Sequence, residues 1–178
     1  MSGHNKWSQI KHKKDITDAK KSKIFSKLVR FISVEAKLSG GKDSPGLRSA
    51  IEKAKKVNMP KDIIEKAVKK ASEPGAHMDS IAYEAYGPGG VGIIIETLTD
   101  SKNRTAQDIK HILVANGSSL AGIGSVTWAF MKEKTPEGLI WKPTTFVSAE
   151  DSDLELLEKL VDDLEENDDV QDVYTNAE

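Results

Sequence analysis

Residues 81–98 read IAYEAYGPGGVGIIIETL, and this stretch decides what the second half of the chain can be. Two runs rich in aromatic and β-branched residues, 81–86 and 92–98, flank the turn residues 87–90. This pattern is typical of two strands joined by a hairpin. Dinucleotide and phosphate loops need their glycines to open a helix, whereas these glycines precede a strand. The stretch therefore predicts a β-hairpin and no phosphate-binding loop.

The residues that follow the hairpin predict two helices and further strands. A helix is expected from about Thr105 to Ala115, capped by Asp100 or Asn103. Strands are expected at 126–131, 139–142 and 170–174, and an amphipathic helix carries the leucines between 154 and 164. From Val91 onward the predicted order is βαββαβ, a ferredoxin-like α/β sandwich. We expect this domain to span 76–178.

The residues before the hairpin predict a small helical bundle. A first helix begins near Asp15 and ends at Gly40–Gly41, with an apolar arc that includes Phe25 and Ile32. A turn at 43–46 precedes a second helix over about 47–57, and a third helix runs over about 61–71. With residues 1–14 as a basic tail, the first domain is expected to span 1–75. The predicted fold class is α+β.

The charged residues are divided unequally along the 178-residue chain. The formal net charge is −2, but residues 1–70 hold 19 Lys+Arg and 7 Asp+Glu, a net +12, and residues 71–178 hold 7 and 21, a net −14. A strongly basic half predicts a polyanionic partner, either nucleic acid or an anionic membrane surface. The last residues, 148–178, are the most acidic part, with 13 acidic residues and one basic residue.

The composition excludes several classes of protein. The chain has no cysteine, which excludes disulfides, thiolate metal sites and a cysteine nucleophile and fits a reducing compartment. No apolar run is long enough to span a bilayer, and no secretory signal is visible, so we expect a cytoplasmic location. The four histidines have no metal-ligand spacing. We therefore expect no metal, no cofactor and no small-molecule substrate.

The candidate nucleic-acid-binding residues fall into three groups. Four cations spaced by three, four and three residues share one face of the first helix, where they can neutralise successive phosphates. The tail adds cations and a tryptophan that can stack on a base, and two more cations stand where a strand passes into a helix. The groups are, in this order, Lys20, Lys23, Lys27 and Arg30; Lys6, Trp7, Lys11, His12, Lys13 and Lys14; and Lys102 and Arg104.

Each of these groups has a plainer explanation. The basic helix face and tail could simply be solvated, or the helix could lie on an anionic membrane, although two following helices compete for its apolar side. Lys102 and Arg104 could merely flank a helix cap. The acidic end could be a solvated helix face, could dock on a basic protein, or could supply paired carboxylates for hydrolysis.

Motifs along nearly the whole chain resemble those of the YebC family of gene-expression proteins. The most specific are SGHNKW at 2–7, IKHKK at 10–14, NMP at 58–60, YEAYGPGG at 83–90, NRT at 103–105 and DDVQDVY at 168–174. The family's fold has a helical domain and two α/β domains, the third inserted into the second. Here only residues 132–148 occupy the place of that insertion, so the chain resembles a short form of the family.

The resemblance implies a non-enzymatic, cytoplasmic, nucleic-acid-associated regulator, acting either in transcription on DNA or in translation on the ribosome. From the residues we favour a ribosome-associated or RNA-associated factor, because no segment reads clearly as a recognition helix with base-reading residues at its start. A DNA-binding transcriptional regulator is the alternative, and a carboxylate-based enzyme ranks below both. The oligomeric state stays open.

Overall fold

The computed structural model describes Trp7 and residues 18–73, 78–135 and 138–178, and for 18–20 and Gly138 it describes the backbone alone. Contacts divide the chain into two compact units. One, the helical unit, lies within residues 16–79; the other, the α/β unit, takes in residues 80–178. The predicted tail, apart from Trp7, lies outside the described residues. Each unit is described by itself.

The helical unit contains α2 (Asp18–Leu38), α3 (Pro45–Lys56) and α4 (Lys61–Ala71). Gly40 and Gly41 both adopt positive φ directly after α2, as a glycine stop predicts. The second helix begins two residues earlier than expected, because Ser44 caps it. The Ser44 hydroxyl accepts a hydrogen bond from the Leu47 N–H at 3.2 Å, and Pro45 occupies the first helical turn.

Small and aliphatic side chains form the core of the helical unit. Alanines recur where the three helices meet, so the helices pack closely. The fully or nearly fully buried members are Ile32, Ala36, Leu47, Ala50, Ala54, Met59, Ile64, Ala67 and Ala71. Phe25 and Phe31 of the predicted apolar arc pack against this cluster but stay partly exposed. The amphipathic pattern of α2 is therefore confirmed, with its deepest contacts in its second half.

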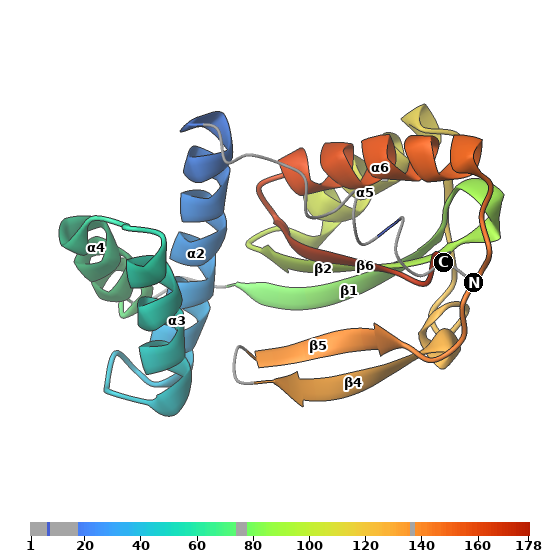
Figure 1. Ribbon diagram of the computed structural model, residues 1–178. Helices are drawn as coiled ribbons and strands as arrows, with labels where there is room; N and C mark the ends of the chain where they lie inside the picture. The colour runs from blue at the N-terminus through green and yellow to red at the C-terminus, as the bar shows by residue number, and fades with distance from the viewer. Residues whose placement is uncertain (1–6, 8–17, 74–77, 136–137) are drawn as a thin grey trace. The chain divides into compact units, whose positions relative to one another are not determined.

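The α/β unit is built on a four-stranded sheet with the order β3-β1-β2-β6 (Figure 1). The strands are β1 (Asp79–Tyr86), β2 (Gly92–Thr99), β3 (Ser119–Leu120) and β6 (Val170–Thr175). The glycine turn between β1 and β2 is a short 3-10 segment, η2 (Pro88–Gly90), in which Gly89 and Gly90 have positive φ. The predicted hairpin is confirmed.

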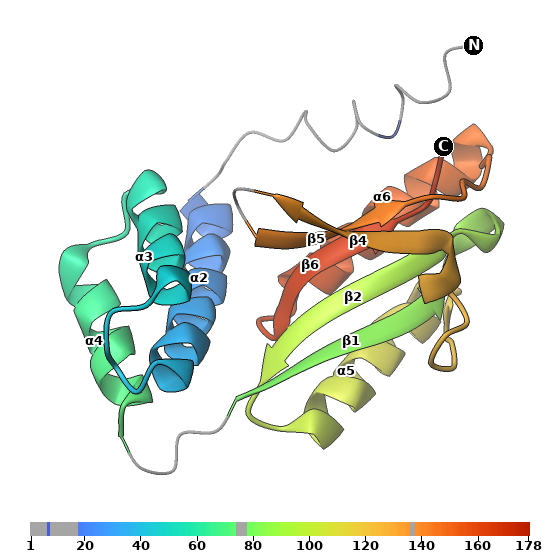
Figure 2. The same cartoon turned by 90° about the horizontal axis from the view of Figure 1, so that it is seen from below.

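The two faces of this sheet are covered differently (Figures 1 and 2). Helices α5 (Lys102–Ala115) and α6 (Asp151–Glu166) cover one face, where Ile93 and Ile95 pack with the α6 leucines. On the other face, Ile94 packs with Val126, Ala129 and Phe130. Val126 immediately precedes η3 (Thr127–Ala129), Ala129 ends it, and Phe130 begins the hairpin β4 (Phe130–Thr135)–β5 (Gly138–Pro143).

The α+β class, with three N-terminal helices followed by an antiparallel sheet, is confirmed, but not every predicted strand belongs to that sheet. The strands expected at 126–131 and 139–142 pair only with each other, as β4 and β5, in a separate two-stranded sheet. Residues 127–129 form η3 and are not part of a strand. The main sheet takes β1 and the two-residue β3 in their place, because the tight turn at 87–91 makes β1 the neighbour of β2.

Candidate nucleic-acid interface

The predicted basic stripe lies on α2. Lys23, Lys27 and Arg30 are in one uninterrupted helix, so their spacings of three and four residues place them on one side of it. All three side chains are half-buried and take part in further interactions within the chain. Lys20 also belongs to α2, although its side chain is outside the described residues. The helix is confirmed, and the binding role of the stripe stays a prediction.

The predicted tail is represented by one residue. Trp7 is half-buried and packs against the apolar cluster of the α/β unit that contains Ile93 and Leu157. The other tail candidates, Lys6, Lys11, His12, Lys13 and Lys14, lie outside the described residues. Packing of the Trp7 indole against an apolar core leaves less of the ring accessible for stacking on a base. Trp7 is thus part of the packing of the α/β unit, and its contact with nucleic acid stays a prediction.

The helical unit carries a second set of cations that the sequence analysis did not single out. Six lysines on α3 and α4 are exposed: Lys55, Lys56, Lys61, Lys66, Lys69 and Lys70. The last three lie on α4 opposite the buried Ile64, Ala67 and Ala71. A helical wheel over 61–71 would have revealed them. Residues 16–79 hold 15 Lys+Arg and 8 Asp+Glu, so this unit has a net charge of +7 even without the tail.

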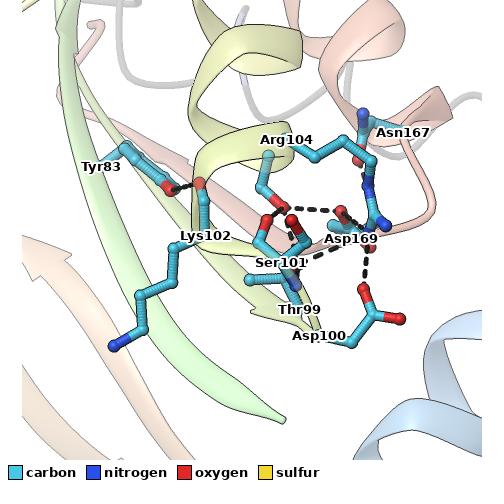
Figure 3. A network of polar contacts seen from close by, with 9 residues as sticks. Tyr83, Thr99, Asp100, Ser101, Lys102, Arg104, Asn167 and Asp169 are labelled. Atoms are coloured by element: carbon cyan, nitrogen blue, oxygen red, sulfur yellow. Dashed lines mark hydrogen bonds and ion pairs between the residues drawn. The ribbon is translucent and has the colours of Figure 1, made fainter.

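Arg104 stands at the start of α5 in a network of polar groups that also includes the end of β2 and the turn before β6 (Figure 3). Its Nη2 donates to Asp100 Oδ1 at 2.9 Å and to Asp169 Oδ2 at 3.0 Å. Thr105 Oγ1 donates to the same Asp169 oxygen at 2.7 Å and lies 2.7 Å from Thr99 Oγ1. The guanidinium therefore joins the segment 100–104 to Asp169, which lies 65 positions further along the chain.

This network changes the electrostatics of the predicted anion site. Hydrogen bonds to Asp169 and Asp100, in that order, raise the pKa of Arg104 above its ordinary value. Two carboxylates thus compensate a cation that was expected to meet phosphate. The predicted caps are wrong as well, because α5 begins at Lys102 with Ser101 as the N-cap residue, and Ser101 makes no side-chain capping bond. Binding of phosphate by Lys102 and Arg104 stays a prediction with less support than the α2 stripe.

Tyr83, on β1, contacts the start of α5 beside this network. Its hydroxyl donates to the Lys102 carbonyl oxygen at 3.5 Å, as Figure 3 shows. Burial and, second, the charge of Asp169 raise the pKa of Tyr83. The phenol therefore stays neutral at physiological pH and acts as a donor that holds the first residue of α5.

Glu84 is a buried carboxylate that the sequence analysis did not identify as special. It is 6% exposed, and its oxygens accept from the N–H groups of Gly124 at 2.7 Å, Val126 at 2.6 Å and Thr127 at 2.9 Å. Burial by itself would raise the pKa of Glu84, but these donors outweigh burial and leave the pKa below its ordinary value. Glu84 thereby fixes the loop that leads into η3.

In the part of the chain that the structure describes, no group of three or more histidine or acidic side chains could hold a metal ion. No helix within the same residues is long and apolar enough to cross a membrane.

A basic three-helix unit followed by an acidic unit with two helices on one face of an antiparallel sheet defines a class of two-unit α+β proteins. Comparison with known proteins places the chain within this class. Residues 5–74 match the TACO1/YebC protein N-terminal domain, and residues 78–137 and 132–177 match the TACO1/YebC second and third domain. The chain belongs to the TACO1/YebC family, as its motifs predicted.

Relatives and a solved structure agree with this assignment. A probable transcriptional regulatory protein of Fervidobacterium nodosum is 41% identical over 99% of this chain and 93% of its own length. Another of the same description, from Petrotoga mobilis, is 46% identical over 100% of this chain and 71% of its own length. The crystal structure of a conserved hypothetical protein from Aquifex aeolicus has a TM-score of 0.85 and 31% identity, covering 97% of this chain and 96% of that one.

The comparisons agree with the predicted short form. The alignment with the Fervidobacterium relative extends over 235 positions, more than the 178 residues of this chain. The TACO1/YebC second and third domain is matched in two ranges that overlap at 132–137.

Proposed function

We propose that this chain is a non-catalytic regulator of gene expression that binds nucleic acid through its helical unit. The observation that carries the proposal is that the boundary between the basic and acidic parts of the sequence coincides with the boundary between the two units. Residues 16–79 have a net charge of +7, and residues 80–178, with 7 basic and 19 acidic residues, have a net charge of −12. A polyanion is attracted by the first unit and repelled by the second. The names of the relatives, probable transcriptional regulatory proteins, support a regulatory role.

Structured RNA, such as that of the ribosome, is the partner we favour. The first turns of the described helices of this unit are Asp18–Ala19–Lys20, Pro45–Gly46–Leu47 and Lys61–Asp62–Ile63. None presents the asparagine, glutamine or arginine that reads base edges from the start of a recognition helix in the major groove. Binding through Lys23, Lys27 and Arg30 along one side of α2 suits recognition of backbone and shape.

Duplex DNA is the second candidate, and the names of the relatives favour it. A DNA-binding regulator of this family would prefer one promoter over random duplex by at least about 10³-fold at physiological salt. Titrations of the full chain with promoter duplexes, random duplex and structured RNA separate the two candidates. A preference of that size for one promoter would replace RNA with DNA as the partner.

Substitution of single lysines tests the proposed interface. Lys23→Ala and Lys27→Ala should each weaken binding to all nucleic-acid sequences alike and reduce the slope of log affinity against log salt by about one. Asp168→Asn, which removes an exposed charge from the acidic unit, is the matched control and should leave binding unchanged or slightly stronger. Unchanged affinity of both lysine variants for RNA and for DNA would remove α2 from the interface.

A further inference from the structure

We propose that the α/β unit contains a second nucleic-acid contact, an aromatic platform on which unpaired bases stack. The platform consists of Tyr86 at the end of β1 and of Ile123 and Trp128 in the loop that Glu84 fixes. The inference rests on the proposed function, because it assigns to the α/β unit a contact with the same class of ligand, nucleic acid, that the helical unit is proposed to bind.

The two rings of the platform are held by one carbonyl group. The Ser125 carbonyl oxygen accepts from Trp128 Nε1 at 2.8 Å and from the Tyr86 hydroxyl at 2.9 Å. The polar atom of each ring is therefore bonded within the chain, and the ring faces are what remains for a ligand. The side chains are open to solvent, with 68% of Trp128, 43% of Tyr86 and all of Ile123 exposed. Exposed, oriented rings are the elements with which proteins bind single strands.

A buried carboxylate holds the loop that carries these residues. Glu84 accepts hydrogen bonds from three backbone N–H groups of the loop, and these donors outweigh the cost of removing the carboxylate from water, so that the pKa of Glu84 lies below its ordinary value. A loop held in one conformation reduces the entropy that binding of a ligand to its exposed side chains would otherwise cost.

The distribution of charge favours nucleic acid over a protein as the ligand. Of the 19 acidic residues in 80–178, 13 lie in 148–178, the segment that contains α6, and α6 covers the opposite face of the sheet (Figure 1). Residues 121–129, which carry Ile123 and Trp128, contain no charged residue. Exposed aromatic rings at an uncharged loop, on the face away from the acidic helix, fit the faces of unpaired bases.

The test uses the full chain and a labelled oligouridine of about a dozen nucleotides. Trp128→Ala should weaken binding by about fivefold or more, the ratio that loss of one stacking contact gives, while the salt slope stays unchanged because no phosphate contact is lost. Trp128→Phe keeps a ring and should restore most of the affinity. Leu139→Ala is the matched control, because Leu139 is 60% exposed on β5 outside the platform, and it should bind like the parent chain.

Glu84 is a positioning residue in this proposal, and its variant separates positioning from mere stability. Glu84→Gln should weaken oligouridine binding, and the double variant with Trp128→Ala should bind no worse than Trp128→Ala alone, since both changes remove the same contact. Near-ultraviolet circular dichroism shows whether the α/β unit stays folded. Additive losses in a folded double variant would contradict the role assigned to Glu84.

The possible outcomes separate the platform from the proposed function. If Trp128→Ala and Ile123→Ala bind oligouridine like the parent while Lys27→Ala weakens it, the platform is wrong and the proposed function stands. If Trp128→Ala weakens binding to intact ribosomes but not to oligouridine, the loop does not stack on unpaired bases and the platform is wrong. If the parent chain binds no nucleic acid, the proposed function fails and the platform fails with it.

Discussion

Two charged residues of the α/β unit, Glu84 and Arg104, have hydrogen-bond partners that the sequence alone does not reveal. Glu84 stands in β1 among Tyr83 and Ala85, and alternation gives no sign that three N–H donors about 40 residues later will enclose it. Arg104 and Asp169 are even further apart, separated by 65 positions. The sequence predicted cations near the start of α5, and Asp100 stands only four residues before Arg104, but the contact of Arg104 with Asp169 is one that only folding creates. The lysine stripe of α2 was predictable because helical spacing alone defines it.

Replacement of Glu84 should change how stability depends on pH. Its folded-state pKa is lowered, so ionised Glu84 stabilises the fold above the unfolded-state pKa of about 4.3, and this contribution disappears as pH falls through the lower folded-state value. Glu84→Gln should reduce the free energy of unfolding near neutral pH by about 1–3 kcal/mol. Urea unfolding at a series of pH values should show the two proteins converging at acidic pH. A difference that stays constant with pH would contradict the assigned charge state.

Thr105 offers a second test, in the network around Asp169. Its hydroxyl is fully buried and makes a 2.7 Å bond to the carboxylate, so Thr105→Val leaves a buried acceptor without its shortest donor. We expect a loss of about 1–3 kcal/mol in the free energy of unfolding of the α/β unit. Thr105→Ser keeps the hydroxyl and should recover most of that loss. Equal stability of the valine and serine variants in urea unfolding would show that the bond contributes nothing.

At the level of elements, the helices and the first hairpin were predictable, whereas the membership of the sheet was not. Periodicity gave α2, α3, α4 and α6, because each has an apolar side that must be buried. The sequence patterns of β4 and β5 do not differ from those of the strands in the four-stranded sheet. Their separation into a second sheet depends on Ile94 packing against Phe130 and on Trp141 Nε1 donating to Glu96 at 2.8 Å. The two-residue β3 is too short for any pattern to reveal.

The turn between β1 and β2 allows a test at this scale. Gly89 and Gly90 both have positive φ, but a Cβ on Gly89 would lie 2.9 Å from an oxygen of Asp153, whereas a Cβ on Gly90 would meet nothing within 4 Å. Gly90→Ala should therefore cost about 1 kcal/mol from backbone strain alone, and Gly89→Ala should cost more. Thermal unfolding of the two variants measures the difference. A less stable Gly90→Ala variant would show that the turn differs from the one described.

At the scale of the whole molecule, the two units have separate cores and should unfold as separate units. Ile32→Ala should destabilise the helical unit by about 2–5 kcal/mol, and Leu157→Ala should destabilise the α/β unit by a similar amount. The three tryptophans, Trp7, Trp128 and Trp141, all belong to or pack on the α/β unit, so fluorescence reports that unit. For Ile32→Ala, the unfolding midpoint seen by far-ultraviolet circular dichroism should fall, while the midpoint seen by tryptophan fluorescence should stay unchanged. A fall of both midpoints would show that the two units unfold as one cooperative molecule.

The division of charge between the units is the central claim at this scale, and the salt dependence of binding tests it. The full chain should bind structured RNA or duplex DNA in dilute buffer, and log affinity should fall linearly as log salt rises, with a slope set by the number of phosphates that the helical unit contacts. Asp168→Asn should leave that slope unchanged. Failure to bind either nucleic acid at low ionic strength, or an affinity that does not respond to salt, would contradict the claim.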